Sequence, residues 1–305
     1  MKSKIKNILI IGAGSMGMSH FESFYNSKNL YNIDLCDLKI KKIQNKLKNI
    51  QKFKRLKFFA NIPKNNKYDL VIIATNSKER YSILKKLLKF NSVSNLILEK
   101  FLFNGIKEYS DFKILIKKYP KVKKVNVNIW GQYLIKKIGL KLNKNFVASY
   151  HLRKKGLATN LIHILDMFCS LTNKDNFEIL SPNLKKLKAK RKGYDELSGN
   201  LIIKNSNGSL RIHDNSKLKH HTLNIKNRGK TFILKINKKK QCFFYINKKL
   251  TKIFKFPLAK NYTEKFFKKS LNSNDLMFNN YDRTSLLSQK ILLFIKSKFD
   301  NFNLT

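Results

Sequence analysis

The amino-terminal part of the chain alternates short apolar runs with longer amphipathic stretches. The apolar runs have the length of buried strands, and the stretches between them repeat apolar positions at the spacing of helices. Strands that alternate with helices form a parallel sheet covered by helices on both faces. The pattern predicts strands at 8–11, 32–36, 57–60, 70–75, 96–99 and 124–129, and helices at 18–25, 40–50, 78–89 and 106–119.

The pattern changes in the carboxy-terminal part, where strict alternation of strands and helices is lost. A helix over 156–168 precedes several strands separated by turn signals such as Asn205-Ser-Asn-Gly208, which is typical of an antiparallel meander. We therefore expect an α/β protein with a doubly wound domain at 1–122 and a second α/β domain with a largely antiparallel open sheet at 123–305. Its strands are predicted at 196–204, 209–213, 221–226, 231–236, 242–246 and 252–256, and a last helix at 283–299.

A glycine-rich turn joins the first predicted strand to the first predicted helix. The segment Gly12-Ala-Gly14-Ser15-Met16-Gly17 has the spacing G-x-G-x-x-G in the required context of strand, turn and helix. Gly12 permits the tight turn, Gly14 lets the backbone approach a pyrophosphate, and Gly17 lets the helix pack closely on the strand. The helix N-terminus then offers free N–H groups to phosphates. This pattern predicts a Rossmann domain that binds a dinucleotide.

Acidic and polar residues at later strand ends extend the predicted cofactor site. Asp37 ends the second strand 20 residues after Gly17, where a carboxylate accepts hydrogen bonds from the adenosine ribose and repels a 2′-phosphate. This favours NAD, although the nearby Lys39 leaves NADP open. Ligands of such sheets lie beyond the carboxyl ends of the strands. The candidate cofactor residues are Gly12, Gly14, Ser15, Met16, Gly17, Asp37, Thr75, Asn76 and Glu99.

The helix predicted at 156–168 carries a polar stripe on an otherwise apolar sequence. At 100° per residue, His163 lies about +40° and Asp166 about −20° from Thr159 around the helix, so the three side chains share one face. The stripe has two interpretations: His163 is a buried histidine satisfied by a helix neighbour, or it takes part in proton transfer. A neutral imidazole suits the second role because its pKa lies near working pH.

Taken together, these residues resemble the Gfo/Idh/MocA oxidoreductases, the family of glucose-fructose oxidoreductase and inositol dehydrogenase. The resemblance covers nearly the whole chain and depends on the glycine turn followed by His20, on Asp37, on Ala74-Thr75-Asn76, on Glu99-Lys100 and on His163-x-x-Asp166. It implies hydride transfer between NAD(P) and a sugar, nucleotide sugar or polyol. It also implies a homo-oligomer formed through the second domain's open sheet, and the stretch 156–163 is similar to members from surface-polysaccharide sugar metabolism.

The resemblance assigns roles to particular side chains, with two departures. It implies that His163 takes the substrate hydroxyl proton, that Lys100 stabilises negative charge on the reacting oxygen, and that Asp166 orients the His–Lys pair. Thr159 stands where family members often have a catalytic Asp, and Phe101 where they have a proline. The alternative is a catalytically inactive nucleotide-binding scaffold or sensor. The candidate catalytic residues are Lys100, His163 and Asp166, and the substrate residues Lys100, Thr159, Asn160 and His163.

The chain is strongly basic, with 65 Lys plus Arg against 18 Asp plus Glu and a formal net charge of +47. Lysines account for most of this charge and are spread over nearly every segment, whereas a nucleic-acid reader concentrates charge on one face and favours Arg. The densest run, 185–192, alternates in the manner of a strand with one solvated face. We therefore expect no specific nucleic-acid partner, but salt-sensitive attraction to polyanions. A polyanion-binding protein is the second alternative.

Cysteine spacing and hydropathy exclude two further classes of protein. Cys36, Cys169 and Cys242 form no C-x-x-C pair, so neither a disulfide framework nor a metal site is expected, and each is predicted to be a small buried side chain. No apolar run approaches the roughly 18 to 20 residues that span a bilayer. The apolar run after the basic N-terminus ends at Gly12, too early for a signal peptide, and a cytoplasmic chain is expected.

Overall fold

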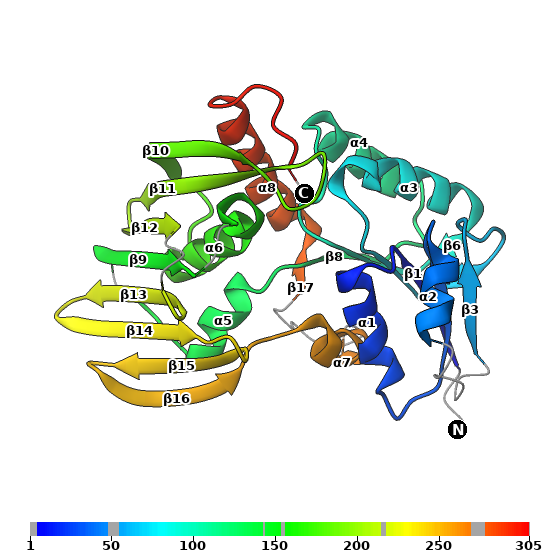
Figure 1. Ribbon diagram of the computed structural model, residues 1–305, viewed down its shortest axis with the longest axis horizontal. Helices are drawn as coiled ribbons and strands as arrows, with labels where there is room; N and C mark the ends of the chain where they lie inside the picture. Colours follow the sequence, from blue (N-terminus) through cyan, green and yellow to red (C-terminus); the bar gives the residue numbers. More distant parts are fainter. Residues whose placement is uncertain are drawn as a thin grey trace. The chain divides into compact units, whose positions relative to one another are not determined.

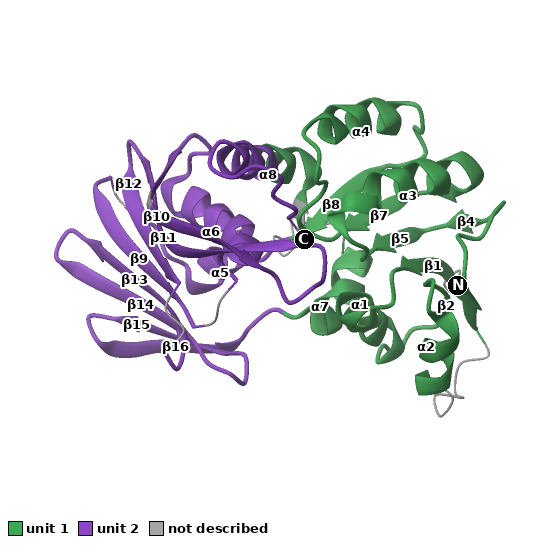
Figure 2. Ribbon diagram, turned by 45° about the horizontal axis from the view of Figure 1, so that its top comes forward, with its two compact units in different colours: residues 1–128, 258–286 green, residues 129–257, 287–305 purple. Residues whose placement is uncertain are grey.

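The computed structural model describes residues 5–47, 55–142, 144–153, 156–214, 218–269 and 278–304, which fall into two compact units (Figure 1). The first unit comprises residues 1–128 and 258–286, and the second comprises residues 129–257 and 287–305. Figure 2 distinguishes the two units by colour. Each unit is built around its own sheet.

The first unit contains a seven-stranded sheet in the order β17-β8-β7-β5-β1-β2-β3. All its pairings are parallel except that of β17 with β8. The central strands are apolar and fully buried because helices cover both faces, as in other parallel sheets. The strands are β1 (Lys6–Ile11), β2 (Tyr31–Cys36), β3 (Leu56–Phe59), β5 (Leu70–Ile73), β7 (Asn95–Leu98), β8 (Lys124–Asn128) and β17 (Phe278–Asn280).

Helices connect the parallel strands, and one further helix returns from late in the chain. That helix, α7 (Ala259–Lys269), packs against α1 (Ser15–Tyr25). Their contact includes a 2.8 Å hydrogen bond between His20 Nδ1 and Thr263 Oγ1 and an edge-to-face contact between the rings of Phe24 and Phe267. The prediction of a doubly wound first domain is confirmed. The remaining elements are α2 (Ile40–Leu47), α3 (Ser77–Phe90), α4 (Lys107–Lys117) and the short strands β4 (Lys67–Tyr68) and β6 (Ser92–Val93).

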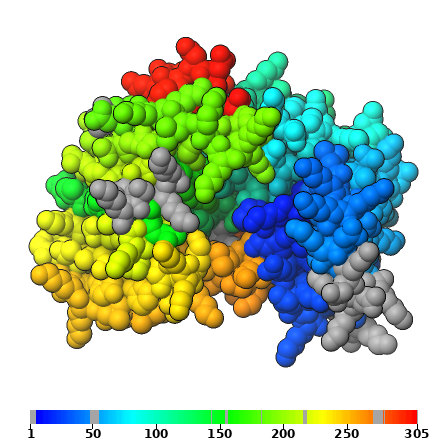
Figure 3. All heavy atoms as spheres, in the orientation of Figure 1, coloured from blue at the N-terminus to red at the C-terminus, as the bar shows by residue number. Residues whose placement is uncertain are grey.

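The second unit contains an eight-stranded sheet in the order β10-β11-β12-β9-β13-β14-β15-β16. Its pairings are antiparallel apart from that of β12 with β9, which confirms the expected largely antiparallel sheet. Residues of β13 to β16, yellow to orange, form a continuous surface in Figure 3. The strands are β9 (Phe146–Leu152), β10 (Glu178–Lys188), β11 (Asp195–Asn205), β12 (Gly208–Asp214), β13 (His221–Asn227), β14 (Lys230–Ile236), β15 (Gln241–Ile246) and β16 (Lys249–Lys255).

Helices α5 (Gly131–Ile138) and α6 (Leu157–Thr172) lie on one side of this sheet (Figure 2). Nearly every residue of α6 is buried, against β11, β12 and α5. The contact with α5 is close at Gly131, where a Cβ atom would lie 2.2 Å from the carbonyl oxygen of His163. Only glycine allows the two helices to approach this closely. Helix α8 (Tyr281–Lys296) follows β17 along the chain and contributes residues to both units.

The observed boundaries differ from the expected ones in several places. The expected division after residue 122 would separate β8 from β7, but these strands pair in parallel, so the first unit extends to Asn128. Residues 258–286, expected in the second domain, also belong to the first unit. The Lys-rich strand ends at Lys188, before the expected 192. The last helix begins at Tyr281 and ends at Lys296, and the part of the second predicted helix at 48–50 lies outside the described residues.

The three cysteines, Cys36, Cys169 and Cys242, lie in the cores of the two units. All three cysteines are buried and reduced, which confirms their interpretation as small core side chains. Within the described ranges, no three His, Cys, Asp or Glu side chains are grouped in a way that could hold a metal ion. None of the helices described is both long enough and apolar enough to cross a bilayer.

Candidate cofactor and substrate sites

The glycine turn adopts the geometry that a dinucleotide requires. Gly12 has a φ of +90°, and its N–H donates to the carbonyl oxygen of Cys36 at 2.8 Å, which closes the turn across β1 and β2. A Cβ atom on Gly17 would lie 1.8 Å from the carbonyl oxygen of Gly12, so a side chain there would push α1 away from the turn. At Gly14 a Cβ would meet nothing within 4 Å, and Ser15 and Met16 are exposed. The start of α1 is therefore accessible to a phosphate group.

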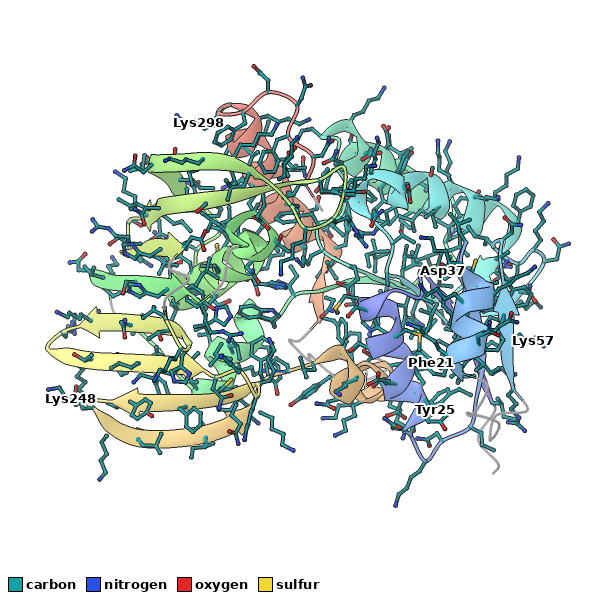
Figure 4. The ribbon with its side chains drawn as sticks, viewed as in Figure 1. Phe21, Tyr25, Asp37, Lys57, Lys248 and Lys298 are labelled. Carbon is teal, nitrogen blue, oxygen red and sulfur yellow. The ribbon has the colours of Figure 1, made fainter. Side chains whose placement is uncertain are left out.

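Asp37 is held in place at the carboxyl end of β2 and appears labelled in Figure 4. Its Oδ2 accepts the N–H of Ala13 at 2.8 Å, and its Oδ1 accepts the N–H of Lys39 at 2.8 Å. The first bond ties the carboxylate to the glycine turn, and the second fixes its rotation. A carboxylate oxygen has room for a second hydrogen bond, so both oxygens remain capable of accepting a ribose hydroxyl. The side chain is only partly buried.

Thr75 and Asn76 follow β5 and lie beside the glycine turn. A Cβ on Gly12 would lie 3.0 Å from Thr75 Cγ2, so the two loops are in direct contact. Within the described residues, the buried Oγ1 of Thr75 makes no hydrogen bond, which is costly unless a further group approaches it. Asn76 is the N-cap of α3, and both residues are partly exposed. The residues at the carboxyl ends of β1, β2 and β5 fit a dinucleotide.

Glu99 belongs to a buried polar cluster, a different environment from that of the glycine turn. Its Oε1 lies 2.8 Å from His20 Nε2 on α1 and accepts the Asn128 amide at 2.7 Å. Burial by itself raises the pKa of Glu99, but the hydrogen bond and charge of His20, together with Asn128, hold that pKa below its usual range. His20 also contacts Thr263 on α7. The carboxylate thus links α1, β8 and, through His20, α7, and its role as a cofactor ligand remains a prediction.

Lys100 follows Glu99 in a loop that a buried arginine fastens. The peptide bond between Lys100 and Phe101 is cis, and Phe101 is fully buried. The guanidinium of Arg80, on α3, donates to the carbonyl oxygens of Glu99 at 2.6 Å and of Leu102 at 2.8 Å. It also donates to those of Phe101 and Thr75. Arg80 thereby connects the backbone segment around Lys100 to the loop after β5.

Arg80 was not among the residues predicted from the sequence, although its position in the α3 pattern could have indicated a buried charge. Arg80 lies four residues before Leu84 and seven before Leu87, on the buried face of α3, and only 1% of its surface is exposed. A charged residue at an apolar position of an amphipathic helix is unusual because burying a charge requires hydrogen-bond partners. Its position indicates that the partners are main-chain carbonyls.

His163 lies on α6 in the second unit, against the only tryptophan of the chain. The rings of Trp130 and His163 are stacked, with centroids 4.4 Å apart and planes inclined by 18°. The backbone N–H of Trp130 points to His163 Nδ1 at 3.4 Å, which favours the tautomer with its hydrogen on Nε2. Asp166 is fully buried, and its Oδ2 accepts the N–H of Gln132 at 2.6 Å, at the start of α5. A carboxylate is favourable there because a helix N-terminus is positive.

Thr159 hydrogen-bonds to a carboxylate that the sequence analysis missed. The Thr159 hydroxyl donates to Oε2 of Glu196, which comes from β11. The Oε1 atom of Glu196 accepts the N–H groups of Ala158 at 2.6 Å and Thr159 at 3.3 Å, so this side chain also caps α6. Nothing in the spacing of the sequence signals this contact, because 37 residues separate the partners. Asn160 instead donates its side-chain amide to the carbonyl oxygen of Gly156 at 2.7 Å.

The predicted residues thus form two groups, one in each unit. The first contains the glycine turn with Asp37 and Thr75, and a neighbouring loop carries Glu99 and Lys100. The second contains Thr159, His163 and Asp166, which lie on the same helix, as the periodicity predicts.

A parallel sheet with a glycine turn and an acid after β2 defines the first unit as a dinucleotide-binding domain of the Rossmann class. In agreement, residues 6–127 match the model of the Gfo/Idh/MocA family, described as an oxidoreductase family with an NAD-binding Rossmann fold. The recognition of this family from the sequence is therefore confirmed, and this part of the chain is an NAD-binding domain of Gfo/Idh/MocA type. A comparison with curated proteins gives no significant sequence match.

Solved structures share the fold over almost the whole chain. A dehydrogenase from Clostridium difficile has a TM-score of 0.67 at 17% identity, covering 97% of this chain and 100% of its own. UDP-N-acetylglucosamine 3-dehydrogenase from Acidithiobacillus ferrooxidans has a TM-score of 0.64 at 11% identity, covering 95% and 96%. The transcriptional regulator Gal80p from Kluyveromyces lactis has a TM-score of 0.67 at 13% identity, covering 97% and 90%. These likenesses define the fold.

Proposed function

We propose that the protein transfers hydride between a nicotinamide cofactor and a CH–OH group of a sugar, nucleotide sugar or polyol. The observation that carries the proposal is the glycine turn of an NAD-binding oxidoreductase domain, with Asp37 bonded to the N–H of Ala13 beside it. When bound, the cofactor supplies or accepts the hydride. The side chains of the protein bind and orient both reactants and move the proton.

NAD is the cofactor that Asp37 favours over NADP. Its carboxylate is fixed by two backbone N–H groups and is partly exposed, which suits two ribose hydroxyls. A 2′-phosphate at the same place would meet a negative charge. The exposed side chain of Lys39 offsets part of this repulsion, so the preference for NAD is expected to be moderate. Asp37→Asn removes the negative charge and should make the affinity for NADP more similar to the affinity for NAD.

Lys100 of the first unit and His163 of the second unit are each proposed as a substrate contact. An ammonium group stabilises the negative charge that develops on the reacting oxygen as the C–H bond breaks. With Nδ1 of His163 directed at the backbone N–H of Trp130, the ring hydrogen lies on Nε2, where it can donate to a substrate oxygen; this ring would then donate a hydrogen bond and not take up the substrate proton as the family resemblance implies. Asp166 acts indirectly, since its hydrogen bond to Gln132 fixes α5 against α6 and thereby supports the Trp130–His163 stack.

Thr159 and Glu196 together supply the carboxylate that the family pattern places on α6. The Thr159 hydroxyl donates to Glu196, which leaves the Oγ1 lone pairs as acceptors for a substrate hydroxyl. In alcohol oxidation, the substrate proton moves to Thr159 Oγ1 while the hydroxyl proton of Thr159 moves to Glu196 Oε2. The reverse transfer serves ketone reduction. The departure at Thr159 is therefore compatible with catalysis, with the acid moved from the helix to β11.

A sugar or nucleotide sugar is the proposed substrate, and surface-polysaccharide metabolism the proposed context. The structural likeness to a UDP-N-acetylglucosamine 3-dehydrogenase supports this class of substrate. We further propose that the protein acts in the cytoplasm as a homo-oligomer. Strand β16, at the edge of the sheet away from β9 and β12, supports an oligomer because it exposes the apolar side chains of Leu250 and Ile253, at 45% and 56% exposure.

The proposal is tested by titrating the protein with NADH and then screening sugars and nucleotide sugars in both redox directions. NADH binding is read by energy transfer from the only tryptophan, Trp130, and turnover by absorbance at the reduced nicotinamide. We expect saturable NADH binding and turnover of at least one sugar. Failure to bind NADH or NADPH would overturn the proposal.

Variants then separate the roles of individual side chains. Lys100→Ala, His163→Ala and Glu196→Gln should each lower kcat at least tenfold while the Kd for NADH stays within about twofold. Lys117→Ala, on the exposed side of α4, is the matched control and should leave both values unchanged. If Thr159→Asp restores turnover to the Glu196→Gln protein, the carboxylate has been moved back to the helix. An unchanged kcat in any single variant removes the role assigned to that residue.

A nucleotide-binding regulator without catalytic activity is the second candidate function. The structural likeness to the transcriptional regulator Gal80p and the loss of the helix carboxylate at Thr159 favour it. It predicts NADH binding of ordinary affinity with no turnover of any sugar. Tight NADH binding that Glu196→Gln leaves intact, together with an inert sugar screen, would support this candidate.

A further inference from the structure

A cationic hollow lies on the face of the second unit's sheet that is opposite α6. Its volume is about 400 Å³, and its lining comes from β9, β11, β12 and β13. The opposite face of the same strands carries Ala148, Tyr150 and Ile212, which are buried. The side chains of the hollow are therefore those that alternation directs away from the core. They belong to Val147, Ser149, His151, Ile202, Ser209, Arg211, His213, Asn224 and Lys226; Ala148, whose side chain is buried, also borders the hollow.

The register of the strands brings the polar residues of the hollow into two adjacent rows. His151 of β9 pairs with His213 of β12, and Ser149 pairs with Arg211. Successive residues on one face are about 7 Å apart along a strand, and neighbouring strands are about 5 Å apart. Arg211 thus lies one step from the two imidazoles, beside a hydroxyl. Asn224 of β13 pairs with Ser149 on its other side.

The two imidazoles are stacked, with ring centroids 4.7 Å apart and planes inclined by only 11°. Nδ1 of His213 lies 2.9 Å from Asn200 Oδ1, which only accepts, so Nδ1 carries the ring hydrogen. Protonation then occurs at Nε2 and creates a second donor. Burial lowers the pKa of both imidazoles, and proximity to His151 and Arg211 lowers the pKa of His213 further. A nearby anion would reverse this effect.

The choice of residue types distinguishes the hollow from the general basic character of the chain. Lysine dominates the basic residues, yet this hollow gathers two of the 6 histidines and an arginine. Lys57, Lys248 and Lys298, in contrast, point singly into solvent (Figure 4). No acidic residue lines the hollow among the residues that the structure describes. Arginine binds tetrahedral oxyanions through paired N–H groups, and hydroxyl and amide donors complete such sites.

We propose that this hollow is a binding site for a phosphate group, either free or esterified to a small molecule. Arg211 donates its fork of N–H groups, His213 donates from Nε2 when charged, and the Ser149 hydroxyl donates as well. Asn224 Nδ2 lies 3.5 Å from Ser149 Oγ and donates to it, which turns the Ser149 hydrogen outward. The site is separate from the proposed dehydrogenase chemistry and does not depend on it.

Anion binding is coupled to protonation of the imidazoles, and the charged groups around them determine whether affinity rises or falls with pH. The charged groups that share this face on neighbouring strands are Arg211 and Lys226, with Lys204 further along β11, Lys185 on β10 and Lys235 on β14. Lys204 is paired at 3.4 Å with Glu178 of β10, which reduces its effect. The free imidazoles are thus surrounded by positive charge. A dianion favours their charged form, so each binding event takes up protons and affinity rises as pH falls.

The test is calorimetric titration of the full chain with sulfate, whose charge is constant from pH 6 to pH 8. Chloride is adjusted to hold ionic strength constant. We expect 1:1 binding that strengthens at least threefold from pH 8 to pH 6, and that Arg211→Gln weakens at least tenfold. Arg228→Gln removes the same charge from an exposed turn and should change the Kd less than twofold. His213→Gln should abolish most of the pH dependence.

Further measurements distinguish the sources of the phosphate group and the alternatives. Inorganic phosphate and glucose 6-phosphate are compared at pH 7, with glucose as the neutral control. Tighter binding of the ester supports a small-molecule ligand, and equal binding supports free phosphate. Equal weakening by Arg211→Gln and Arg228→Gln would show nonspecific attraction to a basic protein and overturn the site. If Arg211→Gln changed the oligomeric state, measured by sedimentation velocity, but left the sulfate Kd unchanged, the site would also be overturned.

Discussion

At the scale of single residues, the buried polar side chains of the first unit act mainly on the backbone that carries the candidate site. Arg80 bonds to main-chain oxygens of two strand-end loops, and Glu99 holds His20 and Asn128 together. Neither side chain needs to touch a ligand to affect binding. A residue that follows a strand end is therefore not automatically a ligand. Glu99 occupies such a position, but its side chain contacts His20 and Asn128 inside the unit.

Replacing Glu99 tests the structural part of this role through its pH dependence. The pKa of Glu99 is lowered on folding, so its stabilising effect is present above the pKa of the unfolded chain and is lost as pH falls through the lower, folded value. Glu99→Gln should lower the free energy of unfolding near neutral pH by about 1 to 3 kcal/mol and reduce its decline on the acid side. The measurement is urea denaturation between pH 3 and pH 7.

The control for this prediction is Glu79→Gln, which removes an exposed carboxylate from the first turn of α3. It should keep the acid decline of the parent protein and lose at most about 0.5 kcal/mol at neutral pH. An identical decline in the Glu99 and Glu79 variants would contradict the assigned effect of the His20–Glu99 contact.

At the scale of elements, the first sheet was predictable from the sequence and parts of the second unit were not. Fully apolar runs such as 70–73 and the glycine turn identify parallel strands without knowledge of their partners. β9, α5 and α7 were missed. The sequence of α7, Ala259–Lys269, contains four lysines and reads as a polar segment, and it is fixed as a helix by its packing on α1. Such long-range packing is not encoded in local periodicity.

The candidate site shows the same division between local and long-range information. Spacing alone placed Gly12, Asp37 and the α6 stripe correctly. The sequence could not show that Glu196 bonds to Thr159, since strands and helices distant in the chain meet only in the folded unit. It also could not show that Trp130 stacks on His163, because no pattern fixes where the residue after a strand points.

Gly131→Ala tests the contact between α5 and α6. The added methyl would lie 2.2 Å from the carbonyl oxygen of His163 and 2.5 Å from the N–H nitrogen of Met167, so the helices must separate. We expect a loss of about 1 to 3 kcal/mol in the free energy of unfolding and a red shift of Trp130 emission as its stack with His163 loosens. Gly105→Ala, where a Cβ meets only Glu108 at 3.4 Å, should cost at most about 0.5 kcal/mol and leave the emission unchanged.

At the scale of the whole molecule, the net charge of +47 acts on every anion that approaches. The lysines are dispersed, so their effect is a long-range field more than a particular contact. A dinucleotide carries negative charge, and its arrival is accelerated by this field. The same field attracts nucleic acid without reading its sequence, and salt screens this attraction. The polyanion-binding alternative instead predicts binding that persists in about 0.5 M salt or that prefers one nucleic-acid sequence.

Stopped-flow measurement of NADH association at 50 mM and 500 mM NaCl tests this effect. The association rate constant should fall at least threefold as salt screens the field, while the dissociation rate constant changes little. Lys57→Gln, which removes only one of the 65 basic side chains, should have almost no effect at either salt concentration. An association rate that is insensitive to salt would show that dispersed charge does not guide the cofactor.

The return of residues 258–286 to the first unit has a consequence for synthesis of the chain. When the ribosome has completed the Rossmann strands β1 to β8, the face of α1 that carries His20 and Phe24 still lacks α7. This face of α1 therefore stays uncovered while more than a hundred further residues are translated. During this interval the uncovered face of α1 is open to aggregation, and the unit is completed only when residues 258–286 have been synthesised.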